Sequence, residues 1–258
     1  MALDELDAFI GDFGGTHSEV DIASRALALQ HRLESANAEL YRTVRAGITG
    51  GDTQTVQRWL EHLAPDDESS GPAPGLGFDL RDDFMTSLFE HSDPGELPSP
   101  RSREMVTYQP TPARHTLDLL KMLSLSADDV FVDLGSGMGH VPLMVSMLTG
   151  ATSLGIEIEP AYVANAERCA RSLQLTNTSF VAADARDADL SRGTVFYLYS
   201  PFTGSILEQV LDRLRQESLR RPIRLCSLGP CTCVLARQQW LQVSGAADPH
   251  CITLFHLR

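Results

Sequence analysis

Two acidic residues and three closely spaced glycines form the part of this sequence best suited to chemistry. The glycines stand at positions 135, 137 and 139, directly after Asp133, and Glu157 follows 22 residues after Gly135. Each acid closes a short apolar run that is typical of a buried strand. Glycines let the backbone turn sharply and leave room for a ligand, and an acid at the second strand tip can hold the hydroxyls of a ribose. The stretch therefore predicts half of a nucleoside-cofactor site.

The spacing also bears on which nucleoside cofactor would bind. The dinucleotide fingerprint is G-x-G-x-x-G, whereas here the third glycine is Gly139 and position 140 is His140. Asp133 stands where the pyrophosphate of NAD would lie, and like charges repel there. S-adenosylmethionine has no phosphate, and its ammonium and carboxylate suit an acid and the free amides of a helix start. The residues favour S-adenosylmethionine, with a nicotinamide-dependent oxidoreductase as the weaker alternative.

The run Asp133–Gly139, followed by Gly155-Ile156-Glu157, resembles class I S-adenosylmethionine-dependent methyltransferases. Within that superfamily the motif DLGSGMGHV looks closest to histone lysine methyltransferases without a SET domain, the disruptor-of-telomeric-silencing family and its bacterial relatives. The resemblance covers residues 105–258. It implies an α/β fold with a Rossmann-like sheet that is mostly parallel and ends in an antiparallel edge hairpin.

The resemblance also implies roles for residues outside the glycine turn. Asp184, after the third strand, would accept a hydrogen bond from the adenine amino group with Ala185 near the ring; alternatively, Asp184 caps the following turn. Tyr108 would border the methionine end of the cofactor, and an ordinary loop tyrosine is the alternative. The residues predicted to bind the cofactor are Tyr108, Asp133, Gly135, Ser136, Gly137, Gly139, Glu157, Asp184 and Ala185.

The acceptor site is predicted at the end of the strand expected over Thr194–Tyr199, because reacting groups gather beyond the carboxyl ends of parallel strands. Tyr199, Ser200 and Phe202 follow there and are predicted to be the catalytic residues, whereas Tyr197 is expected in the core. Aromatic faces would attract a sulfonium or an ammonium by about 0.5–2 kcal/mol. Many amino-group methyltransferases carry two prolines at this point and the histone-lysine family an asparagine nearby. This chain has one proline and no evident asparagine, so the acceptor class stays open.

The remaining chain must position these residues. Apolar periodicity predicts an N-terminal helical region with acidic linkers in residues 1–100 and a methyltransferase domain in residues 101–258. The N-terminal helices are a substrate cap, a homodimer interface or a cover for hydrophobic surface. In the N-terminal region we expect a helix from Thr16 to Gly47, a helix capped by Asp52 or Thr53, a linker over Pro65–Gly77, a short helix holding Phe84 and a loop over Ser92–Ser102. The helices expected in the methyltransferase domain are one with Thr111 as N-cap, one over Pro160–Leu173 and one over Ile206–Arg221. The further strands expected there are a buried strand over Ser179–Ala183, a strand over Ile223–Leu228, and a closing strand pair over Trp240–Val243 and Cys251–Leu257.

Composition narrows the classes of partner. The net charge is −13, and a nucleic-acid binder needs a basic surface, so nucleic acid is disfavoured as a substrate. The arginines at positions 213, 215, 220, 221 and 224 are expected on a solvated helix face. No apolar run has transmembrane length and the N-terminus is acidic, which predicts no membrane attachment and a cytoplasmic location. The five cysteines do not predict a disulfide framework, and Cys231 and Cys233 are expected to be core thiols, with no metal site.

Together these features predict an S-adenosylmethionine-dependent methyltransferase that acts on a protein side chain, with lysine as one candidate, or on a small molecule. The cofactor carries the hard chemistry, so the protein must align donor and acceptor within about 3–3.5 Å and exclude water. If the acceptor arrives protonated, Tyr199, Tyr108 or a local carboxylate is the candidate base. The alternative is a non-catalytic module that binds the cofactor and acts through protein interactions.

Overall fold

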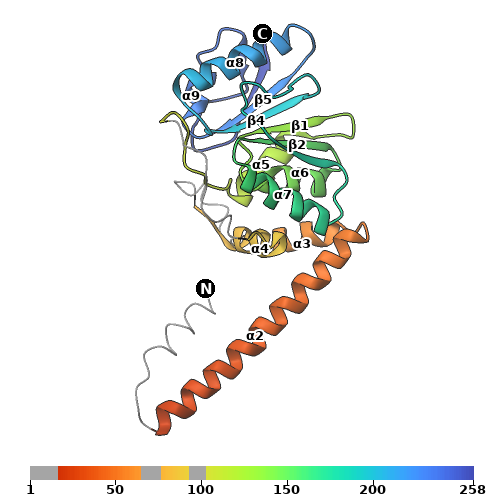
Figure 1. Ribbon diagram of the computed structural model, residues 1–258, viewed down its shortest axis with the longest axis vertical. Helices are drawn as coiled ribbons and strands as arrows, with labels where there is room; N and C mark the ends of the chain where they lie inside the picture. Colours follow the sequence, from red (N-terminus) through yellow and green to blue (C-terminus); the bar gives the residue numbers. More distant parts are fainter. Residues whose placement is uncertain (1–16, 65–76, 93–102) are drawn as a thin grey trace.

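A seven-stranded sheet forms the centre of the molecule (Figure 1). The structure is a computed structural model that describes residues 17–64, 77–92 and 103–258. The strand order is β3-β2-β1-β4-β5-β7-β6, in which β7 runs antiparallel to both β5 and β6 and the other neighbours are parallel. This confirms the predicted mostly parallel sheet with an antiparallel edge hairpin. The strands are β1 Val130–Leu134, β2 Thr152–Glu157, β3 Thr178–Ala182, β4 Val195–Tyr199, β5 Arg224–Leu228, β6 Leu241–Val243 and β7 Thr253–Leu257.

The strand order changes direction at β1: β2 and β3 are added on one side of β1, and β4 and the later strands on the other. This switch point is where a ligand can bind. Asp133 of β1 is in register with Gly155 of β2 on one side and with Tyr197 of β4 on the other. In open α/β sheets the crevice for a ligand opens beyond the carboxyl ends of strands at such a switch point. The sheet order therefore brings the tips of β1, β2 and β4 together.

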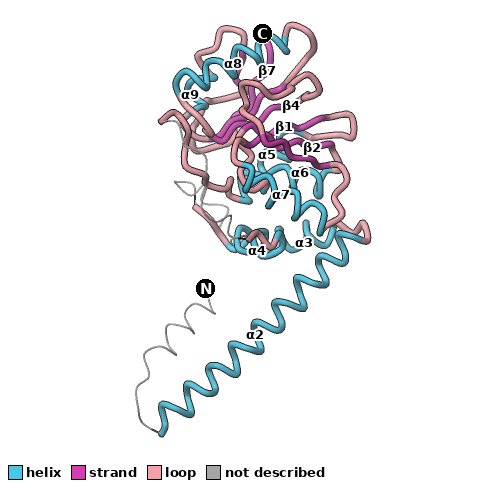
Figure 2. The backbone as a smooth tube through the Cα atoms, in the orientation of Figure 1, coloured by secondary structure: helices cyan, strands magenta, loops and turns pink. Residues whose placement is uncertain are grey.

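Helices cover both faces of the sheet (Figures 1 and 2). Tyr197 packs with residues of α5 and α6, whereas its neighbour Phe196 packs with residues of α8, because successive strand residues point to opposite faces. Tyr197 is fully buried, which confirms its expected place in the core. The helices of this part of the chain are α5 Ala113–Leu123, α6 His140–Thr149, α7 Pro160–Ser172, α8 Gly204–Ser218 and α9 Cys231–Leu235.

The N-terminal helices α2 His17–Thr49, α3 Gln54–His62 and α4 Leu80–Phe89 confirm the expected helical region. Apolar side chains from all three, including Val44 and Leu88, share one buried cluster with Leu143 of α6 and Val163 of α7. Figure 1 shows α3 and α4 against the body and α2 extending away from it. The predicted linker and loop lie almost wholly outside the described residues, as does the predicted boundary at residue 100. The described helices include none that is long and apolar enough to cross a bilayer.

Several local predictions were wrong for identifiable physical reasons. Thr111 does not cap α5, whose N-cap is Pro112, because its hydroxyl lies 3.2 Å from the hydroxyl of Tyr197 and the Asp82 carboxylate accepts from the Ala113 N–H at 2.7 Å. Strand β3 is not buried apart from Phe180, because it forms the edge of the sheet.

The arginine cluster and the cysteines also differ from expectation. Arg213 and Arg221 donate to backbone carbonyls of the loop between β3 and β4, and Arg224 pairs with Asp129 at 2.6 Å. These three side chains therefore tie elements together, which helical periodicity alone cannot show. Cys231 is a core thiol as expected, but Cys233 is exposed on the short helix α9, which was not predicted.

Candidate active site

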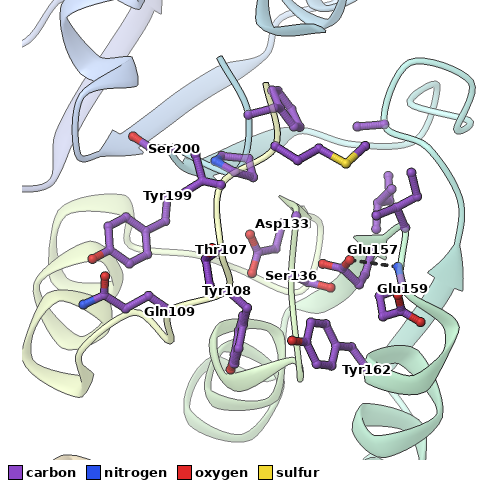
Figure 3. A pocket seen from close by; sticks show the side chains of 18 of the residues that line it. Thr107, Tyr108, Gln109, Asp133, Ser136, Glu157, Glu159, Tyr162, Tyr199 and Ser200 are labelled. Atoms are coloured by element: carbon purple, nitrogen blue, oxygen red, sulfur yellow. Dashed lines mark hydrogen bonds between the residues drawn. The ribbon is translucent and has the colours of Figure 1, made fainter. Parts of the chain in front are cut away.

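A cleft opens at the carboxyl ends of β1, β2 and β4 (Figure 3). It is bounded by the glycine turn, by the loop after β2, by the exit of β4 and by the segment from Met105 to Thr111. In Figure 3, Tyr199 and Gln109 lie at one end, and Glu157, Glu159 and Tyr162 lie at the other. The predicted site residues that line the cleft are Tyr108, Asp133, Gly135, Ser136, Glu157, Asp184, Ala185, Tyr199, Ser200 and Phe202.

The three glycines of the turn allow close approaches within the protein. All three have positive φ angles, which side chains rarely tolerate. A Cβ at Gly135 would lie 2.2 Å from a side-chain carbon of Pro201, and one at Gly137 would lie 2.0 Å from the ring of Tyr108. At Gly139 it would meet the ring of Phe180 at 2.6 Å. Gly137 and Gly139 are not among the residues that line the cleft; Gly137 leaves space for Tyr108, which does line it, and Gly139 leaves space for Phe180.

Glu157 is held in a fixed position at the tip of β2. Its carboxylate accepts one hydrogen bond from the Gly137 N–H and another from the Glu159 N–H, each at 2.9 Å. The residue is 9% exposed, so it is nearly buried while still lining the cleft. Each carboxylate oxygen has a second lone pair, so the group can accept further hydrogen bonds from a ligand. The glycine turn and the predicted ribose acid are thus one hydrogen-bonded unit.

Three buried polar atoms on the cleft wall have no hydrogen-bond partner within the described protein: the Ser136 hydroxyl, Oε1 of Glu159 and the Tyr199 hydroxyl. An unsatisfied buried polar group costs about 1–3 kcal/mol, so such atoms indicate where ligand groups would bind. Glu159 was missed by the sequence analysis. The signal was present in the alternation Gly-Ile-Glu-Ile-Glu, which places a second acid two residues after the first.

Asp133 lies at the tip of β1 and is 4% exposed. Burial, with a smaller contribution from the nearby Glu157, raises the pKa of Asp133 well above its usual value. A cation bound beside it would favour the ionised form again, because opposite charges lower the pKa of a carboxyl group. The end of the cleft formed by β1 and β2 is therefore suited to a ligand that carries a positive charge.

Tyr108 lies across the glycine turn and is held by a half-buried histidine. Its hydroxyl is 3.1 Å from Nδ1 of His140, and its ring centroid is 5.0 Å from that of Tyr162. Burial, followed by the neighbouring His91, lowers the pKa of His140 to about 3. His140 is therefore neutral, so Nδ1 can accept the hydrogen bond that the Tyr108 hydroxyl donates. The sequence analysis predicted no hydrogen-bond partner for His140 and did not single out Tyr162.

Asp184 is engaged by its own loop. Its carboxylate accepts from the Arg186 N–H at 2.8 Å and pairs with the Arg186 guanidinium at 2.7 Å, which lowers the pKa of Asp184. This is the turn-capping arrangement that was the alternative role for the residue. Asp184 also lines the cleft, next to the buried Ala185. Its contact with adenine stays a prediction.

The exit of β4 forms the other end of the cleft. The Ser200 hydroxyl donates to the Leu228 carbonyl at 3.1 Å and accepts from the Cys231 N–H at 3.0 Å, so this side chain is occupied within the protein. Ser200 also has a φ of 43°, a strained value for a residue with a side chain. Phe202 bridges to Met105, which draws the segment after residue 103 against the strand exit. Tyr199 and Phe202 also line the cleft at this end.

Residues 92–196 match the sequence model of the family described as "Histone methylation protein DOT1". This region contains the glycine turn, Glu157 and Asp184, and its strands belong to the sheet described above. The chain is a class I S-adenosylmethionine-dependent methyltransferase. The predicted resemblance to the disruptor-of-telomeric-silencing family is confirmed by the match.

Solved structures that resemble the methyltransferase include an RNA methyltransferase from Salinibacter ruber in complex with S-adenosyl-L-homocysteine, with 25% identity and a TM-score of 0.45 over 58% of this chain and 92% of that one. A SAM-dependent methyltransferase from Aquifex aeolicus has 14% identity and a TM-score of 0.46 over 55% of this chain and 88% of its own. A geranyl diphosphate methyltransferase in complex with GPP and sinefungin has 20% identity and a TM-score of 0.40 over 45% of this chain and 44% of its own. The match thus spans less than half the length of that last enzyme. The comparison with curated proteins found no match.

The cleft of the methyltransferase fits S-adenosylmethionine. The fixed Glu157 carboxylate and the unsatisfied atoms of Ser136 and Glu159 would provide partners for the polar groups of the cofactor. Asp133 lies where a positive charge offsets its burial. When bound, the cofactor supplies an activated methyl group, and the residues of the chain bind it, orient it and exclude water.

Proposed function

We propose that this methyltransferase acts on a nitrogen atom of a protein side chain, most simply that of lysine. The observation that carries the proposal is the separation of charge along the cleft. Its described acidic residues come from β1, β2 and the loops after β2 and β3, namely Asp133, Glu157, Glu159 and Asp184. The segment Met105–Thr111 and the exit of β4 contribute no acidic residue to the described lining, and aromatic faces are present instead.

An acceptor end of this kind suits an amine that reacts in its neutral form. Removing an ammonium group from water without a carboxylate partner lowers its pKa, so the neutral amine, which is the nucleophile, is favoured. Aromatic faces still attract the charged group on arrival, by about 0.5–2 kcal/mol. The proton leaves to water before the methyl group is transferred.

Neither of the tyrosines considered as a base is suited to that role. Burial raises the pKa of Tyr199 and that of Tyr108, so both phenols are protonated at neutral pH. The Tyr199 hydroxyl, which lacks a partner in the described protein, would instead orient the acceptor nitrogen. Ser200 positions the strand exit through its two hydrogen bonds, and Phe202 provides an apolar wall.

The charge of the chain supports a protein acceptor that is basic. A net charge of −13 attracts a basic polypeptide and repels nucleic acid. The match to a family described by histone methylation points in the same direction. We also propose that residues 101–258 are the catalytic domain and that the helices before it cover the side formed by α6 and α7, with which they share a buried cluster.

The proposal is tested by incubating the full chain with methyl-labelled S-adenosylmethionine and a cell extract separated into protein and small-molecule fractions. We expect label in the protein fraction, and methylated lysine after acid hydrolysis. Label confined to the small-molecule fraction would overturn the protein acceptor. Tight binding of S-adenosylhomocysteine without transfer to either fraction would instead support the non-catalytic module. The Glu157→Ala variant serves as the control, because it lacks the carboxylate held at the tip of β2.

A further inference from the structure

Helix α2 carries an apolar stripe that continues beyond the part of the helix that packs on the body. Near its C-terminal end the stripe is covered, with Val44 1% exposed. Further towards the N-terminus the same side of the helix is open, and Leu29 and Leu33 are 44% and 36% exposed. Figure 1 shows this part of α2 projecting from the molecule. The open stripe consists of Ile22, Ala26, Leu29, Leu33 and Ala36 and ends at the half-buried Leu40.

The spacing of the stripe is that of a coiled-coil seam. Its members are separated alternately by four and three residues, which is the repeat that keeps one narrow side of a helix facing a partner helix. Charged residues, among them Arg32 and Glu39, flank the seam. A helix gains most of its stability in water by packing an apolar side against something else. The projecting part of α2 therefore indicates an interface between helices.

We propose that this seam pairs with the same seam of a second copy of the chain, with the two α2 helices antiparallel. In the register that aligns the seams, Leu40 faces Ile22 of the second copy and Leu33 faces Leu29 of the second copy. Ala36 then faces Ala26 of the second copy. Large residues meet large ones and small residues meet small ones in every layer. The proposal is independent of the proposed acceptor.

Charge and shape favour the antiparallel arrangement over a parallel one. Antiparallel pairing brings Arg25 beside Glu39 of the second copy at both ends of the seam, at the cost of placing the two Arg32 side chains near each other at its centre. In a parallel pair, Arg25, Arg32 and Glu39 would face Gln30, Asn37 and Val44, and no opposite charges would meet. Antiparallel helices also align their dipoles favourably.

The position of the body supports the same choice. Helices α3 and α4 pack against the C-terminal end of α2, so a parallel pair would bring both bodies to one end of the seam. In the antiparallel register the two bodies lie at opposite ends. The 33 residues of α2 span about 50 Å, which leaves room for the overlap of the two projecting parts.

The first test measures the mass of the full chain in solution across concentrations by light scattering or sedimentation. We expect a dimer of twice 28.2 kDa that dissociates on dilution. Leu33→Glu, which buries two charges in the seam, should raise the dissociation constant by about 100-fold or more. Leu27→Glu is the matched control, because Leu27 is 43% exposed on the same helix but lies off the stripe. It should change the constant by less than about threefold.

A wild-type chain that stays monomeric at high micromolar concentration would overturn the proposal, and so would an equal effect of the two variants. Circular dichroism of both variants shows whether α2 itself is retained. A second test fixes the direction of pairing, in a background that carries Cys233→Ser and Cys251→Ser. Chains with Ala26→Cys and chains with Ala36→Cys are mixed and oxidised. Antiparallel pairing predicts the mixed disulfide, since a bond needs Cα atoms about 4.4–6.8 Å apart, whereas disulfides between identical variants alone would contradict it.

Discussion

The two ends of the cleft are built in different ways. At the cofactor end, Asp133 and Glu157 come from neighbouring strands that are close in the sequence, and the N–H groups of Gly137 and Glu159 hold the Glu157 carboxylate. At the acceptor end, two distant segments meet, where the Val106 N–H donates to the Pro201 carbonyl at 3.1 Å. The first end carries the acids and the second carries aromatic faces.

The difference shows how one cleft can serve two unlike ligands. A cofactor with fixed charges and a ribose is met by fixed carboxylates and amides, which cost no reorganisation when it binds. The proposed acceptor, an amine that must lose its proton, would meet a surface without carboxylates, which favours its neutral form. The following predictions test whether the two ends are separate in this way, from the largest expected effect to the smallest.

Gly137→Val should disable the cofactor end. A side chain there requires a left-handed backbone, at a cost of about 1–2 kcal/mol. It also displaces the ring of Tyr108, and overpacking of this kind adds about 1–3 kcal/mol. We expect the affinity for S-adenosylhomocysteine in calorimetry to fall by about 100-fold or more, with the fold retained in circular dichroism.

Gly150→Val is the matched control for Gly137→Val. Gly150 also has a positive φ, but nothing lies within 4 Å of its added Cβ. The control should lose stability through its backbone and keep its affinity for the cofactor product. Unchanged affinity in Gly137→Val would contradict the role of the turn.

Glu157→Ala should weaken S-adenosylhomocysteine binding by about 1–3 kcal/mol, because it removes a fixed acceptor and leaves two backbone amides unpaired. Glu159→Ala removes a carboxylate that has an unpaired buried oxygen, and we expect a smaller loss of about 1 kcal/mol. Calorimetry of both variants gives the comparison. A change of only a few tenths of a kcal/mol in Glu157→Ala would reject its role in holding the ribose.

The acceptor end is tested by the pH dependence of methyl transfer. Below the pKa of the amine, its neutral fraction rises tenfold per pH unit, so kcat/KM should increase by up to about tenfold per unit between pH 7 and 9. Because the pKa of Tyr199 is raised, its phenol stays protonated over that range. Tyr199→Phe should therefore keep the slope and lower the rate by about two- to tenfold, as expected for the loss of one hydrogen bond. A variant whose rate no longer depends on pH would show that Tyr199 is the base after all.

Much of the cofactor end was predictable from local sequence. The glycines, Asp133 and Glu157 lie within one strand–turn–helix–strand unit, and such a unit places its residues by short-range geometry. Their partners were not predictable in the same way. The glycine turn was expected to leave room for the ligand, yet at Gly137 the space belongs to Tyr108, which arrives from a segment before the domain's first helix.

The sequence by itself determined the order of elements, the cofactor class and the acids that we propose hold it, because hydrophobic periodicity, glycines and strand-end acids act over short distances. Only the tertiary structure decided that His140 belongs to the site, that the Ser200 hydroxyl is occupied by Leu228 and Cys231, and that Asp184 pairs with Arg186. These are contacts of individual polar atoms. Such contacts depend on how loops from distant parts of the chain pack together over the sheet, and the periodicity of the sequence does not predict that packing.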